Sequence, residues 1–188
     1  GRVSASQSMG DAARQTILGG MDNWLFINRD VRNKENPLGS QGIAQRDVFM
    51  SDFATSMRGF NINKLSGNSH LLVNLELRVP LKSLIGQDFS KSKFMNSFQF
   101  VGFSDIGSAW TGSNPFSRTN GFNTNVYGGN TNPFKATVTD FRNPFLIGYG
   151  AGIRANLLGY FIKLDYAYGI ENSEVKSPIT YLTFGHDF

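Results

Sequence analysis

The sequence predicts an all-β protein whose strands belong to an antiparallel transmembrane β-barrel. Apolar and polar residues alternate in stretches of roughly ten residues, the length at which a tilted strand crosses a bilayer. The composition combines 17% charged and 13% aromatic residues with 21 glycines among 188 residues. The sequence ends on an aromatic residue, Phe188, which closes the last alternating stretch. Each of these features is typical of strands that face lipid on one side only.

Five stretches alternate clearly, and a sixth at the start of the sequence alternates more weakly. Strands are therefore expected at 2–9, 71–79, 98–110, 146–157, 160–168 and 179–188. In 71–79 every second residue is apolar, whereas Asn74, Glu76 and Arg78 share the opposite face. In 98–110, Asp105 likewise lies opposite the apolar face. Because apolar groups must meet lipid, we expect Glu76 and Asp105 to face the lumen.

The connections between these stretches alternate between short and long. Short links are expected at 82–93 and 157–160, long ones at 11–66 and 111–143, and one of intermediate length at 171–178. Outer-membrane barrels have short periplasmic turns and long extracellular loops. A periplasmic C-terminus would place all three longer connections outside the cell. The segments 11–66 and 111–143 are thus expected to be long extracellular loops.

Six strands are too few to close a membrane barrel. An open edge in lipid would leave backbone groups unpaired, and known barrels have about eight strands or more. We therefore expect residues 1–188 to form the C-terminal part of a larger barrel of about 16 strands. The remaining strands would come from the N-terminal part of the same protein and would pair with the edges 2–9 and 179–188.

Composition excludes several other classes. The net charge of +4 comes from scattered Lys and Arg residues, which argues against nucleic acid as a partner. There is no cysteine, and His70 and His186 are far apart, so neither a metal site nor a cofactor is expected. No nucleophile elbow is present, so we do not expect an enzyme. The sequence contains no uninterrupted apolar run of about 18 residues, so a transmembrane helix is not expected.

An ordered set of motifs spans nearly the whole chain. Met57-Arg58-Gly59-Phe60 is followed by the strand with Glu76, by Gly102-Phe103-Ser104-Asp105-Ile106-Gly107-Ser108-Ala109-Trp110, and by a final strand with Gly185. This order resembles the C-terminal end of the bacterial surface-antigen family, the BamA and TamA relatives. In that family a (V/I)RGF loop tip, a strand with an inward Glu and an (F/W)xDxGxxW strand follow one another. The chain departs from it in Met57, and in the long stretch between Gly20 and Met57.

The resemblance implies that the tip of 11–66 folds back into the barrel. Arg58 would then meet Glu76 and Asp105, Gly59 would permit a tight turn, and Phe60 would anchor the loop. Three glycines on the inner wall, at 148, 150 and 152, would leave room for it. The residues taken alone leave an alternative open, in which Arg58 is solvated and Asp105 pairs along the wall. Its partner would then be one of three cations, Arg78, Arg154 or Lys163.

The resemblance also implies a function. Gly185 and Phe188 would mark a lateral seam, where a weakened last strand opens toward lipid and templates incoming strands. The protein would then insert client β-barrels into the outer membrane of a Gram-negative bacterium, with accessory lipoproteins and the lipid bilayer as partners. Two alternatives stay open. One is a translocation pore or barrel anchor of the same family, and the other is a small independent barrel acting as an adhesin or structural protein.

Overall fold

The computed structural model describes residues 1–10, 13–21, 25, 51–53, 56–85, 97–117, 124–127, 136–139, 142–157 and 160–185. Regular structure in these ranges is almost entirely antiparallel β-sheet, which confirms the all-β class. One helix, α2 (Leu81–Ile85), follows strand β5 (Ser69–Pro80) in this described part. Across the same ranges, no helix is long and apolar enough to cross a membrane.

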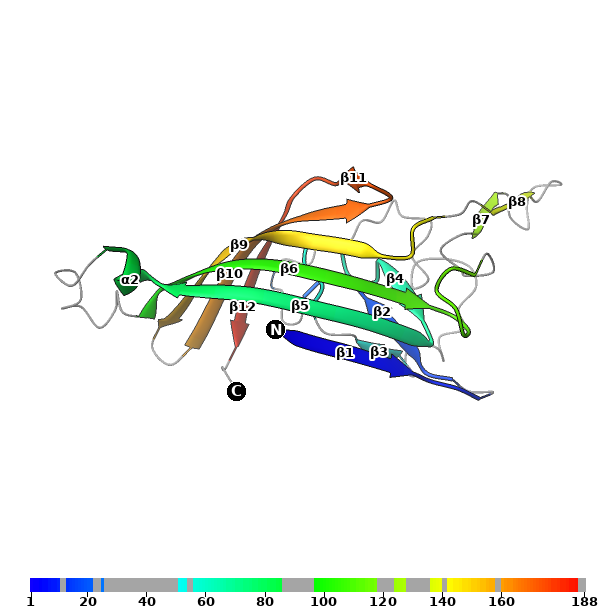
Figure 1. Ribbon diagram of the computed structural model, residues 1–188, viewed down its shortest axis with the longest axis horizontal. Helices are drawn as coiled ribbons and strands as arrows, with labels where there is room; N and C mark the ends of the chain where they lie inside the picture. Colours follow the sequence, from blue (N-terminus) through cyan, green and yellow to red (C-terminus); the bar gives the residue numbers. More distant parts are fainter. Residues whose placement is uncertain are drawn as a thin grey trace.

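A curved seven-stranded sheet forms the body of the protein (Figure 1). Its strands are β1 (Arg2–Gln7), β5 (Ser69–Pro80), β6 (Gln99–Trp110), β9 (Leu146–Leu157), β10 (Tyr160–Glu171), β11 (Glu174–Val175) and β12 (Ile179–Gly185). They pair in the order β1-β5-β6-β9-β10-β11, and β12 also pairs with β10. The six expected strands are all present. The prediction for β10 was too short, because it continues into a hairpin with β11.

The two long connections contain strands of their own, which the sequence patterns did not reveal. Within 11–66, β2 (Gln15–Leu18), β3 (Ser51–Phe53) and β4 (Leu65–Gly67) form a separate sheet in the order β3-β2-β4. Within 111–143, β7 (Thr124–Tyr127) pairs with β8 (Ala136–Thr139). In the described part of the chain, none of these five strands joins the main sheet, and that sheet does not close into a barrel.

The register gives the main sheet an apolar outer face and an inner face that mixes charged and apolar residues. On the outer face, Leu75 lies opposite Ser104, and Ile153 lies opposite Leu164. The side chains of Leu75, Ile153 and Leu164 are 53%, 38% and 42% exposed. The inner face carries Glu76 and the buried Asp105, as the alternation predicted. These three apolar side chains therefore lie on the face opposite Glu76 and Asp105.

A mixed core fastens segment 11–66 to the inner face. One buried cluster joins residues of this segment to residues of the main sheet: Leu18, Met57, Phe60, Leu65, Leu72, Ala109 and Leu146. A second cluster packs Met21 of the segment against Val101, Phe103, Ala167 and Tyr181. Figure 1 shows β2 and β4 on the concave side of the sheet. This packing brings the Arg-Gly-Phe tip against the wall.

Candidate functional site

The backbone of the long segment positions Arg58 over the inner face. Gly20 and Met57 form an isolated antiparallel bridge, with reciprocal N–H to C=O hydrogen bonds of 3.0 and 2.9 Å. Met57 is fully buried in the core. Gly59 then has a φ of 89°, a left-handed conformation that suits glycine. The turn thus holds Arg58 between a fixed bridge and a tight bend.

Arg58 contacts both of the acids that the resemblance implied. Its Nε and Nη2 each lie 2.7 Å from a carboxylate oxygen of Asp105, and its Nη1 lies 2.5 Å from Oε1 of Glu76. The backbone N–H of Arg58 also donates to Asp105, at 3.1 Å. The guanidinium lies over the Phe103 ring, 3.7 Å from its centroid. Arg58 is 3% exposed and Asp105 is completely buried. A two-pronged, charge-assisted contact of this kind is strong and directional.

The charge state of Arg58 is secured by its partners. Burial by itself lowers the pKa of Arg58, but the hydrogen bonds and charges of Asp105 and Glu76 outweigh burial and raise that pKa. The guanidinium therefore stays protonated at every physiological pH. The contact consequently cannot be released by loss of the arginine proton.

Glycines decide how closely the tip approaches the wall. A Cβ on Gly148 would overlap the carbonyl oxygen of Arg58, and one on Gly59 would lie 2.5 Å from the carbonyl oxygen of Tyr168. The expectation that Gly148 leaves room for the tip therefore agrees with the geometry. A Cβ on Gly150 or Gly152 would instead meet β10, so these two glycines permit close strand packing and do not accommodate the tip.

Arg154 and Asp165 extend the contact into a network along the wall. Arg154 Nη1 and Nη2 donate to the two oxygens of Asp165, the second at 3.0 Å, and both residues are buried. Arg154 also lies 3.6 Å from Glu76. Arg58 lies 3.8 Å from Asp165. We call these five residues, Arg58, Glu76, Asp105, Arg154 and Asp165, the Arg58 network.

The alternative in which Asp105 pairs with a wall cation is wrong. Asp105 accepts hydrogen bonds from Arg58 and, at 2.8 Å, from the side-chain amide of Asn74. Arg78 donates to Glu76, at 2.9 and 3.1 Å. Arg154 donates to Asp165 on the adjacent strand, although the residue directly opposite Arg154 in the register is Lys163. Alternation placed both on the same face, but only the register brings their side chains together.

Tyr181 of β12 holds the tip from the other side, and the sequence reasoning missed it. Its hydroxyl accepts the Gly59 N–H at 2.9 Å and donates to the Phe60 carbonyl at 2.7 Å. Its side chain is completely buried. The one available signal was its place on the same face as Thr183 in the final strand. A buried tyrosine needs a partner for its hydroxyl, and here that partner is the backbone of the tip.

Replacing Tyr181 with phenylalanine is expected to loosen the tip. The change leaves the Gly59 N–H and the Phe60 carbonyl without their partner, at a cost of about 1–3 kcal/mol for each unsatisfied buried group. The midpoint of urea unfolding should fall, and proteolysis within 11–66 should accelerate. Tyr149→Phe removes a hydroxyl from the outer face and should leave both measurements unchanged. Equal behaviour of the two variants would contradict this role for Tyr181.

Of the two residues expected at the lateral seam, Gly185 and Phe188, the structure describes Gly185. Phe188 lies outside the described residues. Gly185 pairs regularly with Phe161, and a Cβ added to it would meet no atom within 4 Å. The edge of β12 is not wholly free, because the Leu25 N–H donates to the Leu182 carbonyl at 3.1 Å. Steric need therefore does not explain the glycine at position 185.

The Arg58 network holds the tip of segment 11–66 against the sheet by ion pairs and hydrogen bonds. Within the described ranges, no group of three or more His, Cys, Asp or Glu side chains could hold a metal ion. Comparison with models of protein families, with curated proteins and with solved structures finds no match for this chain. What the Arg58 network can do is fasten a long segment to the inner wall of the sheet.

Proposed function

We propose that this chain is the C-terminal part of an outer-membrane β-barrel, similar to BamA, that inserts other β-barrel proteins into the membrane. The observation that carries the proposal is the contact of Arg58 with Glu76 and Asp105. It joins three motif residues that are far apart in the sequence and follow the order of the surface-antigen family. A segment held on the inner wall leaves the edge of the sheet as the place where client strands would pair.

The outer face supports contact with lipid. Large apolar side chains are exposed along all of its long strands: Leu75, Leu77, Phe100, Ile106, Tyr149, Ile153, Leu164, Tyr166 and Phe184. Soluble monomers rarely expose a continuous apolar patch of more than a few hundred Å². The four longest strands have 12 residues each, enough to cross a bilayer when tilted. A lipid-facing sheet accounts for both features.

Arginine in place of Leu75 tests the membrane assignment. Leu75 lies near the middle of β5, and a central arginine on a lipid-facing strand costs about 2–4 kcal/mol. Stability measured by urea unfolding from lipid vesicles should fall by that amount. Ser113→Arg, in an exposed connection, should change it by less than about 0.5 kcal/mol. Equal stability of the Leu75 variant and the parent protein would mean that this face meets water.

Insertion is preferred to the two alternatives on structural grounds. The Arg58 network and its segment occupy the concave face, which argues against a wide channel. A small independent barrel would need strands from 11–66 in the main sheet, and β2, β3 and β4 pair with one another instead. Neither alternative gains an observation that favours it.

The test is an insertion assay with the intact polypeptide in lipid vesicles. A urea-denatured small β-barrel should fold faster in these vesicles than in empty ones, and the rate is read from the heat-modifiable mobility of the folded form. Gly185→Val should slow this folding, because valine stiffens the last strand, and a Cβ at this position meets no atom within 4 Å. Gly102→Val, on the outer face of β6, is the matched control. Folding no faster than in empty vesicles would refute the function.

A further inference from the structure

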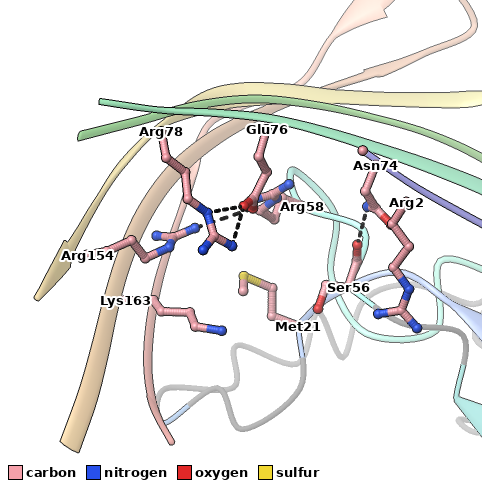
Figure 2. A pocket seen from close by; sticks show the side chains of 10 residues that line it. Arg2, Met21, Ser56, Arg58, Asn74, Glu76, Arg78, Arg154 and Lys163 are labelled. Carbon is pink, nitrogen blue, oxygen red and sulfur yellow. Dashed lines mark hydrogen bonds and ion pairs between the residues drawn. The ribbon is translucent and has the colours of Figure 1, made fainter. Parts of the chain in front are cut away.

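A basic pocket lies on the inner face beside the Arg58 network. It has a volume of about 550 Å³, and its wall includes five cations and one carboxylate: Arg2, Arg58, Arg78, Arg154, Lys163 and Glu76. Figure 2 shows Arg78, Arg154 and Lys163 on one side of the pocket and Arg2 on the other. Arg154 and Lys163 lie near the ends of β9 and β10 that adjoin 157–160. The pocket therefore lies toward the end of the sheet that carries the short turn.

Three of the four arginines in the wall, Arg58, Arg78 and Arg154, are held in place before any ligand arrives. Asp105 fixes Arg58, and Asp165 fixes Arg154. Oε1 of Glu76 accepts a hydrogen bond from Arg58, and Oε2 accepts one from Arg78. Rigid guanidinium groups lose little conformational entropy when they bind an oxyanion. The wall is thus preorganised for an anionic group.

The pocket has more positive than negative charge. Arg2 and Lys163 form no ion pair with any described residue, and the Lys163 ammonium lies 5.2 Å from the Phe161 ring centroid. Among the residues that the structure describes, the five cations of the wall face three carboxylates, namely Glu76 in the wall and Asp105 and Asp165 behind it. Two positive charges are therefore left unbalanced. A single ligand with two negative charges would neutralise them.

We propose that this pocket binds a phosphate monoester group. Such a group carries about −1.5 to −2 charges at pH 7 and offers three acceptor oxygens. Arginine forks match the geometry of phosphate, and lysine adds a point charge. A volume of about 550 Å³ is within the range of small-molecule sites and admits a phosphorylated small molecule or a lipid headgroup. This ligand is separate from the client proteins of the proposed insertion activity.

The experiment is calorimetric titration of the intact polypeptide in non-ionic detergent, at about 0.15 M salt to screen long-range charge. Inorganic phosphate is the first probe. Short-chain phosphatidic acid, a lipid phosphate monoester, is the second, and phosphatidylcholine is its control. Arg2→Gln and Lys163→Gln remove the two unpaired cations without touching the Arg58 network. Lys64→Gln removes a cation that is paired with Glu171 outside the pocket.

Saturable binding of phosphate that weakens about tenfold or more in Arg2→Gln and Lys163→Gln, but not in Lys64→Gln, supports the proposal. The same pattern with phosphatidic acid alone assigns the group to a lipid headgroup. Binding of both probes assigns a site for the phosphate group itself. Absence of binding by both probes, or binding that the pocket variants leave intact, overturns it.

Discussion

Replacing Arg58 with alanine is expected to destabilise the protein by about 3–5 kcal/mol, because it leaves a buried carboxylate without its cation. Asp105 is completely buried and, among the described residues, would keep only Asn74 as a side-chain donor. Glu76 would retain Arg78 and the more distant Arg154. The tip of 11–66 would lose its strongest contact with the wall. Urea unfolding from lipid vesicles measures the loss, and limited proteolysis within 11–66 reports release of the segment.

An exposed ion pair provides the control for this prediction. Arg14 lies 3.4 Å from Asp52, and both side chains are mostly exposed. Arg14→Ala should cost no more than about 1 kcal/mol, as is usual for surface pairs. In the double variant Arg58→Ala, Asp105→Ala the loss should be smaller than the sum of the two single losses, because the unpaired carboxylate is gone. Strict additivity would show that Arg58 and Asp105 do not stabilise each other.

Replacing Gly148 with alanine is expected to displace the tip from the wall. The added methyl group would overlap the Arg58 carbonyl oxygen, which is backbone and cannot rotate away. Overpacking of this kind costs about 1–3 kcal/mol or more. The substitution keeps every charge of the Arg58 network, so it tests docking separately from ion pairing. Faster proteolysis within 11–66 and a lower urea midpoint are the expected results.

The matched control is Gly102→Ala on the adjacent strand β6. A Cβ at Gly102 would meet no atom within 4 Å, and the residue lies on the outer face. The same chemical change should therefore leave stability within about 0.5 kcal/mol of the parent protein. If Gly148→Ala behaved like Gly102→Ala, the tip would not rest on β9.

The contact of Arg58 with Glu76 and Asp105 is one that the family resemblance implied, whereas spacing alone favoured a solvated Arg58. The physical reason is that Arg58 lies in a long connection, where no local periodicity tells which wall the segment will meet. Tyr181 was missed for a similar reason. Its partners are backbone groups of Gly59 and Phe60, more than 120 positions earlier in the chain. A pattern of side chains along the sequence does not reveal which backbone groups a side chain will bind.

Sequence periodicity predicts the six main strands and which side chains share a face, because side chains alternate with a strict period of two along any strand. It therefore placed Leu75 outside and Asp105 inside before any pairing was known. The pairing of Arg154 with Asp165 and the close approach of the tip to Gly148 become evident only in the folded protein. These contacts depend on the register between strands and on the docking of a distant segment, which sequence periodicity does not encode.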